Sequence, residues 1–179
     1  MQRRVRSEKP ITTSHIPRRS TLSNNGAEEL GRLLKERGET LAVAETTTGG
    51  MISARIIAVP GSSACYDRGV VAYSKASKTE SLGIAESELD RHGAVSPETA
   101  RLLAEAVRDL SRTTYGLAET GIAGPILGRS PKPVGTAYVA CAGPKGTDVV
   151  ALQVDGDRAA IQQGIAGEAI SFLISLLSS

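Results

Sequence analysis

The segment LAVAETTTGG, residues 41–50, constrains the fold of this chain more than any other part of its sequence. A short apolar run ends in an acidic residue, and three threonines and two glycines then precede a helix-like stretch, MISARIIAV. This order predicts a buried strand, a hydroxyl-rich turn and the start of a helix. Helix N-termini leave backbone N–H groups unpaired, and glycines let a ligand approach the backbone closely. The segment therefore predicts an anion or nucleophile site where a strand meets a helix.

The rest of the chain alternates short apolar runs with amphipathic segments, an order typical of a layered α/β domain. Helices interleave the early strands, and Pro144-Lys145-Gly146 predicts a hairpin between the last two strands. These signals predict a single-domain α/β/α sandwich in which helices flank a mixed sheet. The expected strands cover residues 41–45, 69–74, 115–119, 134–142 and 149–154. The expected helices cover residues 27–37, 49–59, 75–83, 86–93, 97–110 and 158–177.

The clearest helix signals lie in residues 96–110. Ser96 is a favourable N-cap, and Pro97 suits the first helical turn because a backbone N–H is not needed there. Asp157 provides a similar cap for the C-terminal helix. Apolar residues at helical spacing predict a buried face on the long helix and another on the first helix. These residues are Ala100, Leu103, Ala104, Val107 and Leu110 on the former, and Leu30, Leu33 and Leu34 on the latter.

The composition limits both the core and the cofactors. Of the 179 residues, 40% are hydrophobic and only 3% are aromatic, so aliphatic side chains must fill the core of a single domain. Cys65 and Cys141 lack the close spacing of a metal cluster or a redox pair, and we expect both to be small buried residues. The sequence predicts no metal and no other cofactor.

Charge is distributed unevenly along the chain. Residues 1–25 carry six basic side chains and one acidic one, a net charge of +5, which leaves −3 for residues 26–179 out of a total of +2. The body therefore lacks the positive potential of a nucleic-acid-binding domain. The tail is typical of an organelle transit segment, a partner-binding arm or a flexible extension, and we favour the extension. Its basic residues are Arg3, Arg4, Arg6, Lys9, Arg18 and Arg19.

These features suggest a location for the protein. The sequence has no secretory signal and no apolar run of about 18 residues, so we expect neither a membrane span nor a membrane partner. We expect residues 26–179 to form the folded domain. The expected location is the cytoplasm, with organelle targeting by residues 1–25 as the alternative.

Two turns that contain hydroxyl groups and glycines follow short strands, at residues 46–50 and 120–124. Ligands of open α/β sheets bind at the carboxyl ends of the strands, so both turns could hold one ligand with phosphate or carboxylate groups. Neither turn has a P-loop or dinucleotide fingerprint, and tight loops without a ligand are the alternative. Tyr73 and Lys78 follow the second strand. A lysine there is either a general base with a lowered pKa or an ordinary solvated residue.

Six sequence blocks carry a resemblance to a known family. They are LAVAETTTGG at 41–50, VPGSSACYDRGVVAYS at 59–74, Lys78-Thr79 with Leu82-Gly83, RHGAVS at 91–96, TGIAGP at 120–125 and KPVGTAYVA at 132–140. In this order and spacing the chain resembles the CinA C-terminal domain family, whose characterised activity is the deamidation of nicotinamide mononucleotide by PncC-type amidohydrolases. The resemblance implies the α/β fold of that family and a homo-oligomer of two or more copies.

The resemblance also implies a mechanism and a small-molecule nucleotide substrate. Family members hydrolyse the carboxamide of nicotinamide mononucleotide, and they need no cofactor. Their serine nucleophile, activating lysine and assisting tyrosine correspond here to Thr46, Lys78 and Tyr73. Such a lysine removes the hydroxyl proton and can return a proton to the leaving ammonia. The residues implied to bind the substrate are Glu45, Thr48, Gly49, Gly50, Thr120, Gly121, Gly124 and Arg129.

Three departures from the family pattern bear on the activity. The usual ESCTGG is ETTTGG here, so Thr46 and Thr47 replace serine and cysteine. The extra methyl of Thr46 restricts its rotamers, and misplacing a reacting group by about 1 Å can cost ~10²-fold in rate. Ile126 and Leu127 replace glycines, and Glu119 stands where an apolar residue is usual. The alternative function is therefore a nucleotide-binding or interaction protein without efficient catalysis.

Overall fold

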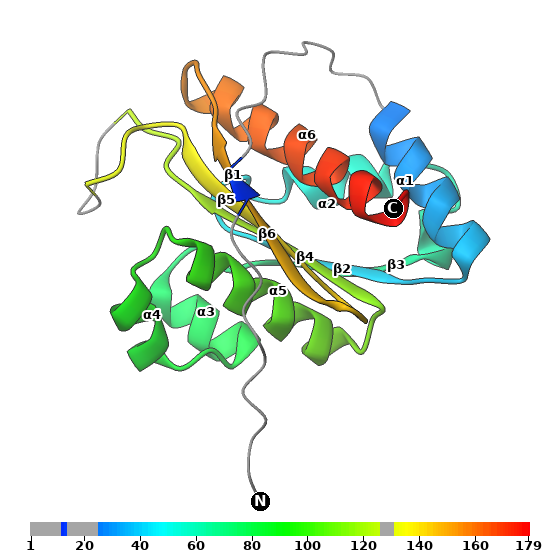
Figure 1. Ribbon diagram of the computed structural model, residues 1–179, viewed down its shortest axis with the longest axis horizontal. Helices are drawn as coiled ribbons and strands as arrows, with labels where there is room; N and C mark the ends of the chain where they lie inside the picture. Colours follow the sequence, from blue (N-terminus) through cyan, green and yellow to red (C-terminus); the bar gives the residue numbers. More distant parts are fainter. Residues whose placement is uncertain (1–11, 14–24, 126–130) are drawn as a thin grey trace, which may run out of the picture.

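The computed structural model describes residues 12–13, 25–125 and 131–179 of the chain. Its centre is a six-stranded sheet with the order β1-β6-β5-β4-β2-β3 (Figure 1). β2 pairs in parallel with β3 and β4, whereas β5 pairs antiparallel with β4 and β6, so the sheet is mixed as predicted. The strands are β1 (Thr12–Thr13), β2 (Leu41–Glu45), β3 (Tyr66–Val71), β4 (Tyr115–Gly121), β5 (Thr136–Gly143) and β6 (Gly146–Gln153).

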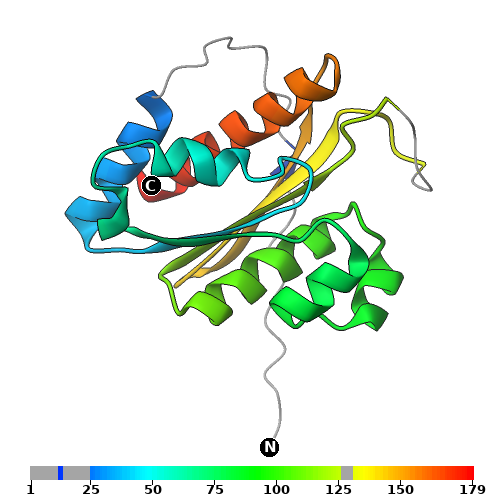
Figure 2. The same ribbon diagram turned by 180° about the vertical axis from the view of Figure 1, so that it is seen from behind.

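Helices cover both faces of this sheet (Figures 1 and 2). α1, α2 and α6 lie on one face, and α3, α4 and α5 lie on the other, which confirms the predicted α/β/α sandwich. The helices are α1 (Asn25–Arg37), α2 (Met51–Ile57), α3 (Lys75–Leu82), α4 (Glu86–His92), α5 (Pro97–Ser111) and α6 (Arg158–Leu177), with a short 3₁₀ helix at Ser62–Ala64.

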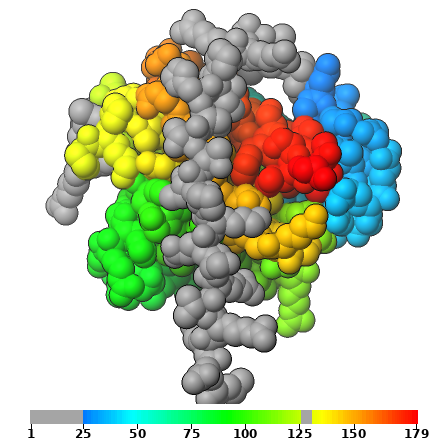
Figure 3. Space-filling view, viewed as in Figure 1, coloured from blue at the N-terminus to red at the C-terminus, as the bar shows by residue number. Residues whose placement is uncertain are grey.

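α6 forms the centre of the first helical layer. It packs beside α1, and the two helices share the surface of this layer (Figure 3). Among the described helices, α6 alone is long and apolar enough to cross a membrane by length and composition. Its side chains Ile161, Ile165 and Leu173, however, are buried in the hydrophobic core. Cys65 and Cys141 are free thiols buried in the same core, as predicted.

α5 forms the centre of the opposite layer. Ser96 caps it by accepting a backbone hydrogen bond, and Pro97 occupies its first turn, as predicted. Leu110, which the helical spacing predicts to be buried, is instead 47% exposed because it faces an open groove beside α5 rather than the sheet. The other predicted core residues of this helix are completely buried, namely Ala100, Leu103, Ala104 and Val107.

Three strands extend two or more residues beyond their predicted bounds. β3 begins at Tyr66 rather than at Gly69, because this edge strand is largely exposed and its first residues show no apolar run. β4 continues to Gly121, where antiparallel pairing with Ala137 of β5 lengthens it. β6 begins at Gly146, the last residue of the predicted hairpin turn. Backbone pairing therefore sets these ends, whereas the hydrophobic pattern marks only the buried part of each strand.

The short strand β1 has no counterpart in the sequence-based expectation. Thr12 and Thr13 pair in parallel with Val150 and Ala151 of β6. Two residues of the expected N-terminal extension thus join the edge of the sheet. Its last residue, Asn25, begins α1, and the other residues of that extension lie outside the described part of the chain.

Gly116 of β4 provides a test of the close packing between α5 and the sheet. A Cβ at this position would overlap the carbonyl oxygen of Ala104, which is a backbone atom. We therefore expect Gly116→Ala to lower the free energy of unfolding by about 1–3 kcal/mol, measured by urea denaturation. Gly26→Ala is the control, since its Cβ would meet Ile170 at 3.5 Å, an ordinary contact. Equal stability of Gly116→Ala and the wild type would contradict this packing.

Candidate active site

The carboxyl ends of β2 and β4 lie side by side because the two strands are parallel neighbours. The first turn, residues 46–50, follows β2, and the second turn, residues 120–124, begins at the end of β4. The hydroxyl of Thr47 donates a 2.9 Å hydrogen bond to the carbonyl oxygen of Gly121. The two turns that the sequence places after separate strands therefore meet at one edge of the sheet, where ligands of such sheets bind.

Glu45 holds the first turn together. Its side chain is completely buried. Oε1 accepts hydrogen bonds from the N–H and the hydroxyl of Ser53, at 2.8 and 2.6 Å. Oε2 accepts hydrogen bonds from the Thr48 hydroxyl at 2.6 Å and from the N–H groups of Gly50 and Ile52 at 2.8 and 3.1 Å. These donors surround the start of α2, where an anion is favoured, so Glu45 positions the turn rather than facing a ligand.

Glu119 holds the same turn from the neighbouring strand. Its buried Oε1 accepts hydrogen bonds from the N–H of Thr46 at 2.6 Å and from the N–H of Thr48 at 2.9 Å, and the Thr48 hydroxyl oxygen lies 2.9 Å from the same Oε1. Oε2 is also buried and has no hydrogen-bond partner among the described residues. Burial raises the pKa of Glu119; the bonds from Thr48 and Thr46 oppose this shift, and the charge of Glu45 adds to it.

Thr46, the predicted nucleophile, is buried within this network. Its hydroxyl donates a 3.1 Å hydrogen bond to the main-chain carbonyl of Glu119 and lies 3.4 Å from the hydroxyl of Thr47. Its N–H is bound to the side chain of Glu119. Glu119 therefore contacts both polar groups of Thr46, one through its side chain and the other through its main chain.

Lys78, the predicted base, lies on α3 with only 5% of its surface exposed. Its Nζ donates hydrogen bonds to the carbonyl oxygens of Tyr73 and Ser74, at 3.0 and 3.4 Å. Burial lowers the pKa of Lys78, and the charge of Glu119 opposes this shift. Within the described part of the chain, no hydrogen bond joins Nζ to the Thr46 hydroxyl. Proton transfer between them therefore needs a bridging water or a shift on substrate binding, as is common for catalytic pairs.

Tyr73 lies at the exposed side of this region, with 67% of its surface accessible. Its hydroxyl accepts a 3.5 Å hydrogen bond from Nη2 of Arg158, the first residue of α6. Nη1 of the same guanidinium donates a 2.8 Å hydrogen bond to the carbonyl oxygen of Gly124. Arg158 thus joins Tyr73 to the second turn and adds a cation that the sequence analysis does not assign.

The remaining predicted residues shape the two turns. The hydroxyl of Thr120 donates a 2.7 Å hydrogen bond to the carbonyl oxygen of Ala94. Gly49 and Gly124 have φ values of 62° and 67°, a conformation that glycine adopts without strain. Arg129 lies outside the described residues.

Two backbone donors of the first turn have no partner among the described residues, the N–H groups of Thr47 and Gly49. The two carboxyl groups already take the N–H groups of Thr46, Thr48 and the first turn of α2. Gln162 of α6 fixes the turn further by donating a 2.8 Å hydrogen bond to the carbonyl oxygen of Thr47. The two unpaired N–H groups are therefore the positions left for an oxyanion or a phosphate oxygen.

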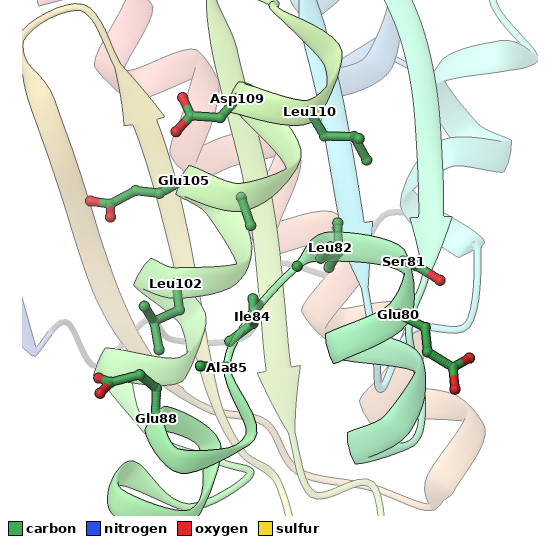
Figure 4. Close-up of a pocket in the computed structure, with 12 residues that line it drawn as sticks. Glu80, Ser81, Leu82, Ile84, Ala85, Glu88, Leu102, Glu105, Asp109 and Leu110 are labelled. Carbon is green, nitrogen blue, oxygen red and sulfur yellow. The ribbon is translucent and has the colours of Figure 1, made fainter.

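An open groove lies elsewhere, between α5 and the segment that joins α3 to α4 (Figure 4). Its volume is about 530 Å³, and Leu82, Ile84 and Leu102 contribute apolar side chains. None of the predicted site residues that the structure describes lines this groove. Acidic side chains surround it and disfavour an anionic nucleotide, so the two turns remain the candidate site. These acidic residues are Glu80, Glu88, Glu105 and Asp109.

Sequence reasoning missed three contacts of the site. Glu119 was noticed only as a departure from a family pattern, although an acid at the end of an apolar strand is a signal of a buried polar site. Arg158 and Gln162 carry no comparable signal, because they lie on α6 and reach the turns only through the tertiary fold.

Comparisons with known proteins agree on one family. Residues 23–177 match the profile of the CinA C-terminal domain. A putative competence-damage inducible protein of Caldanaerobacter subterraneus is 50% identical over 127 residues, which are 71% of this chain and 31% of that protein. A CinA-like protein of Anaeromyxobacter sp. strain K is 46% identical over 152 residues, which are 83% of this chain and 37% of that protein. The chain thus spans about a third of the length of these relatives.

Two solved structures share the fold. A competence-damaged protein (CinA) superfamily protein of Klebsiella pneumoniae has a TM-score of 0.84 at 28% identity, covering 87% of this chain and 97% of that one. The competence/damage inducible protein CihA of Agrobacterium tumefaciens has a TM-score of 0.75 at 34% identity, covering 86% and 96%. With a family profile that matches nearly the whole described domain, this chain belongs to the CinA C-terminal domain family.

Proposed function

We propose that this chain hydrolyses the carboxamide of nicotinamide mononucleotide, releasing ammonia and leaving nicotinate mononucleotide. The observation that carries the proposal is a buried lysine that has Glu119 as a neighbour in common with the hydroxyl-rich first turn. Burial lowers the pKa of Lys78, and the neighbouring Glu119 binds the N–H of Thr46. A lysine of this kind and an oriented hydroxyl are the two groups that a hydroxyl-nucleophile amidase requires.

The proposed reaction proceeds through an ester on Thr46. Lys78, as the free amine, removes the hydroxyl proton while Oγ1 of Thr46 attacks the carboxamide carbon. The tetrahedral oxyanion is stabilised by the unpaired N–H groups of Thr47 and Gly49. The lysine then returns its proton to the nitrogen, and ammonia leaves. Water hydrolyses the ester with the same lysine as base and releases nicotinate mononucleotide.

The phosphate of the nucleotide needs a cation near the second turn. Arg158 is suited to this role, since its guanidinium already bridges Tyr73 and the carbonyl oxygen of Gly124. A guanidinium can bind phosphate oxygens with two parallel hydrogen bonds. We therefore assign Arg158 to the phosphate of the substrate.

Binding without efficient catalysis is the second candidate function. The absence of a hydrogen bond between Thr46 and Lys78 in the described residues favours it, as does the extra methyl of a threonine nucleophile. Calorimetry that detects nicotinamide mononucleotide binding, together with no ammonia release, would support this candidate over the first.

A cytoplasmic homo-oligomer also belongs to the proposal. β3 is the last strand in the sheet order, and exposed apolar side chains lie on it and next to it. Val71 and Tyr73 are 51% and 67% exposed, and Ile57 at the end of α2 is 59% exposed. An edge of this kind favours pairing with a second copy of the chain.

Substitution of Thr46 tests the nucleophile. We expect Thr46→Ala to lower ammonia release from nicotinamide mononucleotide at least about 10²-fold, because no hydroxyl remains to attack. Thr46→Ser should raise the rate about 10-fold, since it keeps the hydroxyl and removes the methyl. Thr47→Ser, the same change one residue later, is the control. Activity of Thr46→Ala equal to that of the wild type would exclude Thr46 as the nucleophile.

The pH dependence of the reaction tests Lys78. The base must be unprotonated, and burial lowers its pKa, so kcat/KM should rise with pH around a value below the ordinary lysine pKa of about 10.4. Lys78→Met should lower kcat by about 10²–10⁴-fold. Lys75→Met, which removes an exposed lysine of the same helix, is the control. A rise of kcat/KM centred at or above the ordinary lysine pKa is incompatible with Lys78 as the base.

Kinetics of an Arg158 variant test the phosphate contact. We expect Arg158→Gln to raise KM for nicotinamide mononucleotide about 10-fold with little change in kcat, since the phosphate binds equally in the ground and transition states. Arg91→Gln, an exposed arginine of α4, controls for the loss of a surface charge. An unchanged KM would assign the phosphate to another residue.

A further inference from the structure

Thr48 lies between two buried carboxyl groups. Its hydroxyl oxygen is 2.6 Å from Oε2 of Glu45 and 2.9 Å from Oε1 of Glu119. Both distances are hydrogen-bond lengths, and each hydrogen bond requires one proton. A threonine hydroxyl supplies one proton only. The second proton must therefore belong to one of the two carboxyl groups.

The surroundings favour Glu119 as the group that carries this proton. Glu45 accepts four further hydrogen bonds, from Gly50, Ile52 and Ser53 at the start of α2, whereas Glu119 accepts two, from the N–H groups of Thr46 and Thr48. The larger set of donors stabilises the anion on Glu45. Glu119 is completely buried, and its Oε2 has no partner among the described residues. An ionised carboxylate with a bare oxygen in such a site is costly, whereas a neutral acid is much less so.

Two titratable groups face Glu119 in the described part of the chain, Glu45 from β2 and Lys78 from α3. The charge of Glu45 disfavours a second negative charge beside it. Nζ of Lys78 donates to the carbonyl oxygens of Tyr73 and Ser74, so it makes no hydrogen bond that would hold Glu119 in the ionised form. The raised pKa of Glu119 agrees with this placement of the proton.

We propose that Glu119 is a positioning residue that acts as a neutral carboxyl group. It shares one proton with Glu45 through the Thr48 hydroxyl. It fixes Thr46 by accepting the N–H on its side chain and the O–H on its main chain. A neutral Glu119 also leaves Lys78 without a carboxylate partner, which keeps the free amine accessible. The effect on catalysis rests on the proposed function, whereas the shared proton is independent of it.

Stability as a function of pH tests the shared proton. Folding raises the pKa of Glu119, so its contribution is complete at low pH and is lost as the pH rises through the folded-state pKa. We expect the urea midpoint of the wild type to fall relative to that of Glu119→Gln as the pH rises above the ordinary glutamate pKa of about 4. Glu80→Gln, which removes an exposed charge of α3, should follow the wild type. The neutral carboxyl group is overturned if the difference in urea midpoint between the wild type and Glu119→Gln stays constant with pH. It is also overturned if that difference changes in favour of the wild type as the pH rises.

Ammonia release tests the positioning role. Glu119→Val removes the acceptor for the Thr46 N–H and should lower kcat at least about 10-fold with little change in KM. Glu119→Gln should recover most of this loss and keep the pH at which kcat/KM rises. If Glu119 were ionised, Glu119→Gln would lower the pKa of Lys78 and move that rise to lower pH. Such a move, or full activity of Glu119→Val, overturns the positioning role.

The two experiments separate this proposal from the proposed function. If the wild type releases no ammonia while its midpoint falls relative to Glu119→Gln as described, the amidase assignment is wrong and the shared proton is supported. If ammonia is released but the urea midpoint of the wild type does not fall relative to that of Glu119→Gln, the amidase assignment is supported and the neutral Glu119 is wrong.

Discussion

The interaction on which the site depends is the pair of buried carboxyl groups that meet at one threonine hydroxyl. Glu45 and Glu119 stand at or near the carboxyl ends of adjacent parallel strands, and between them they accept hydrogen bonds from the first turn and from the start of α2. Without them, several backbone N–H groups would be buried without partners, at a cost of about 1–3 kcal/mol each. The pair therefore determines where α2 begins and in which direction Thr46 points.

Two departures from the family pattern meet in this structure. The family resemblance implies a serine at Thr46 and an apolar residue at Glu119, and these two residues are joined by two hydrogen bonds. They are therefore coupled changes in one contact, and their effects on activity are not expected to be additive. The same contact leaves the N–H groups of Thr47 and Gly49 as the donors available to a ligand. The chemistry of the first turn thus follows from which of its donors the protein itself uses.

The sequence predicts most of the fold because the main elements carry local signals. The apolar run of β2 and the Ser96-Pro97 start of α5 are examples, whereas β1 and the exposed start of β3 depend on backbone pairing that no hydrophobic pattern records. In the site, the position of the first turn follows from its strand, hydroxyl groups and glycines. The hydrogen-bond partners of that turn cannot be predicted in the same way. Glu119 is 73 residues from Thr46 and reaches it only because β2 and β4 are neighbours. A local pattern shows which groups form a turn, and the topology decides what holds it.

Infrared spectroscopy near neutral pH reports directly whether Glu119 is protonated in the folded protein. A protonated carboxyl group absorbs apart from a carboxylate, so the difference spectrum between the wild type and Glu119→Gln isolates the state of this one side chain. A neutral Glu119 gives a protonated carboxyl band in the wild type that is missing from Glu119→Gln. A carboxylate band in that difference spectrum, with no protonated carboxyl band, would contradict it.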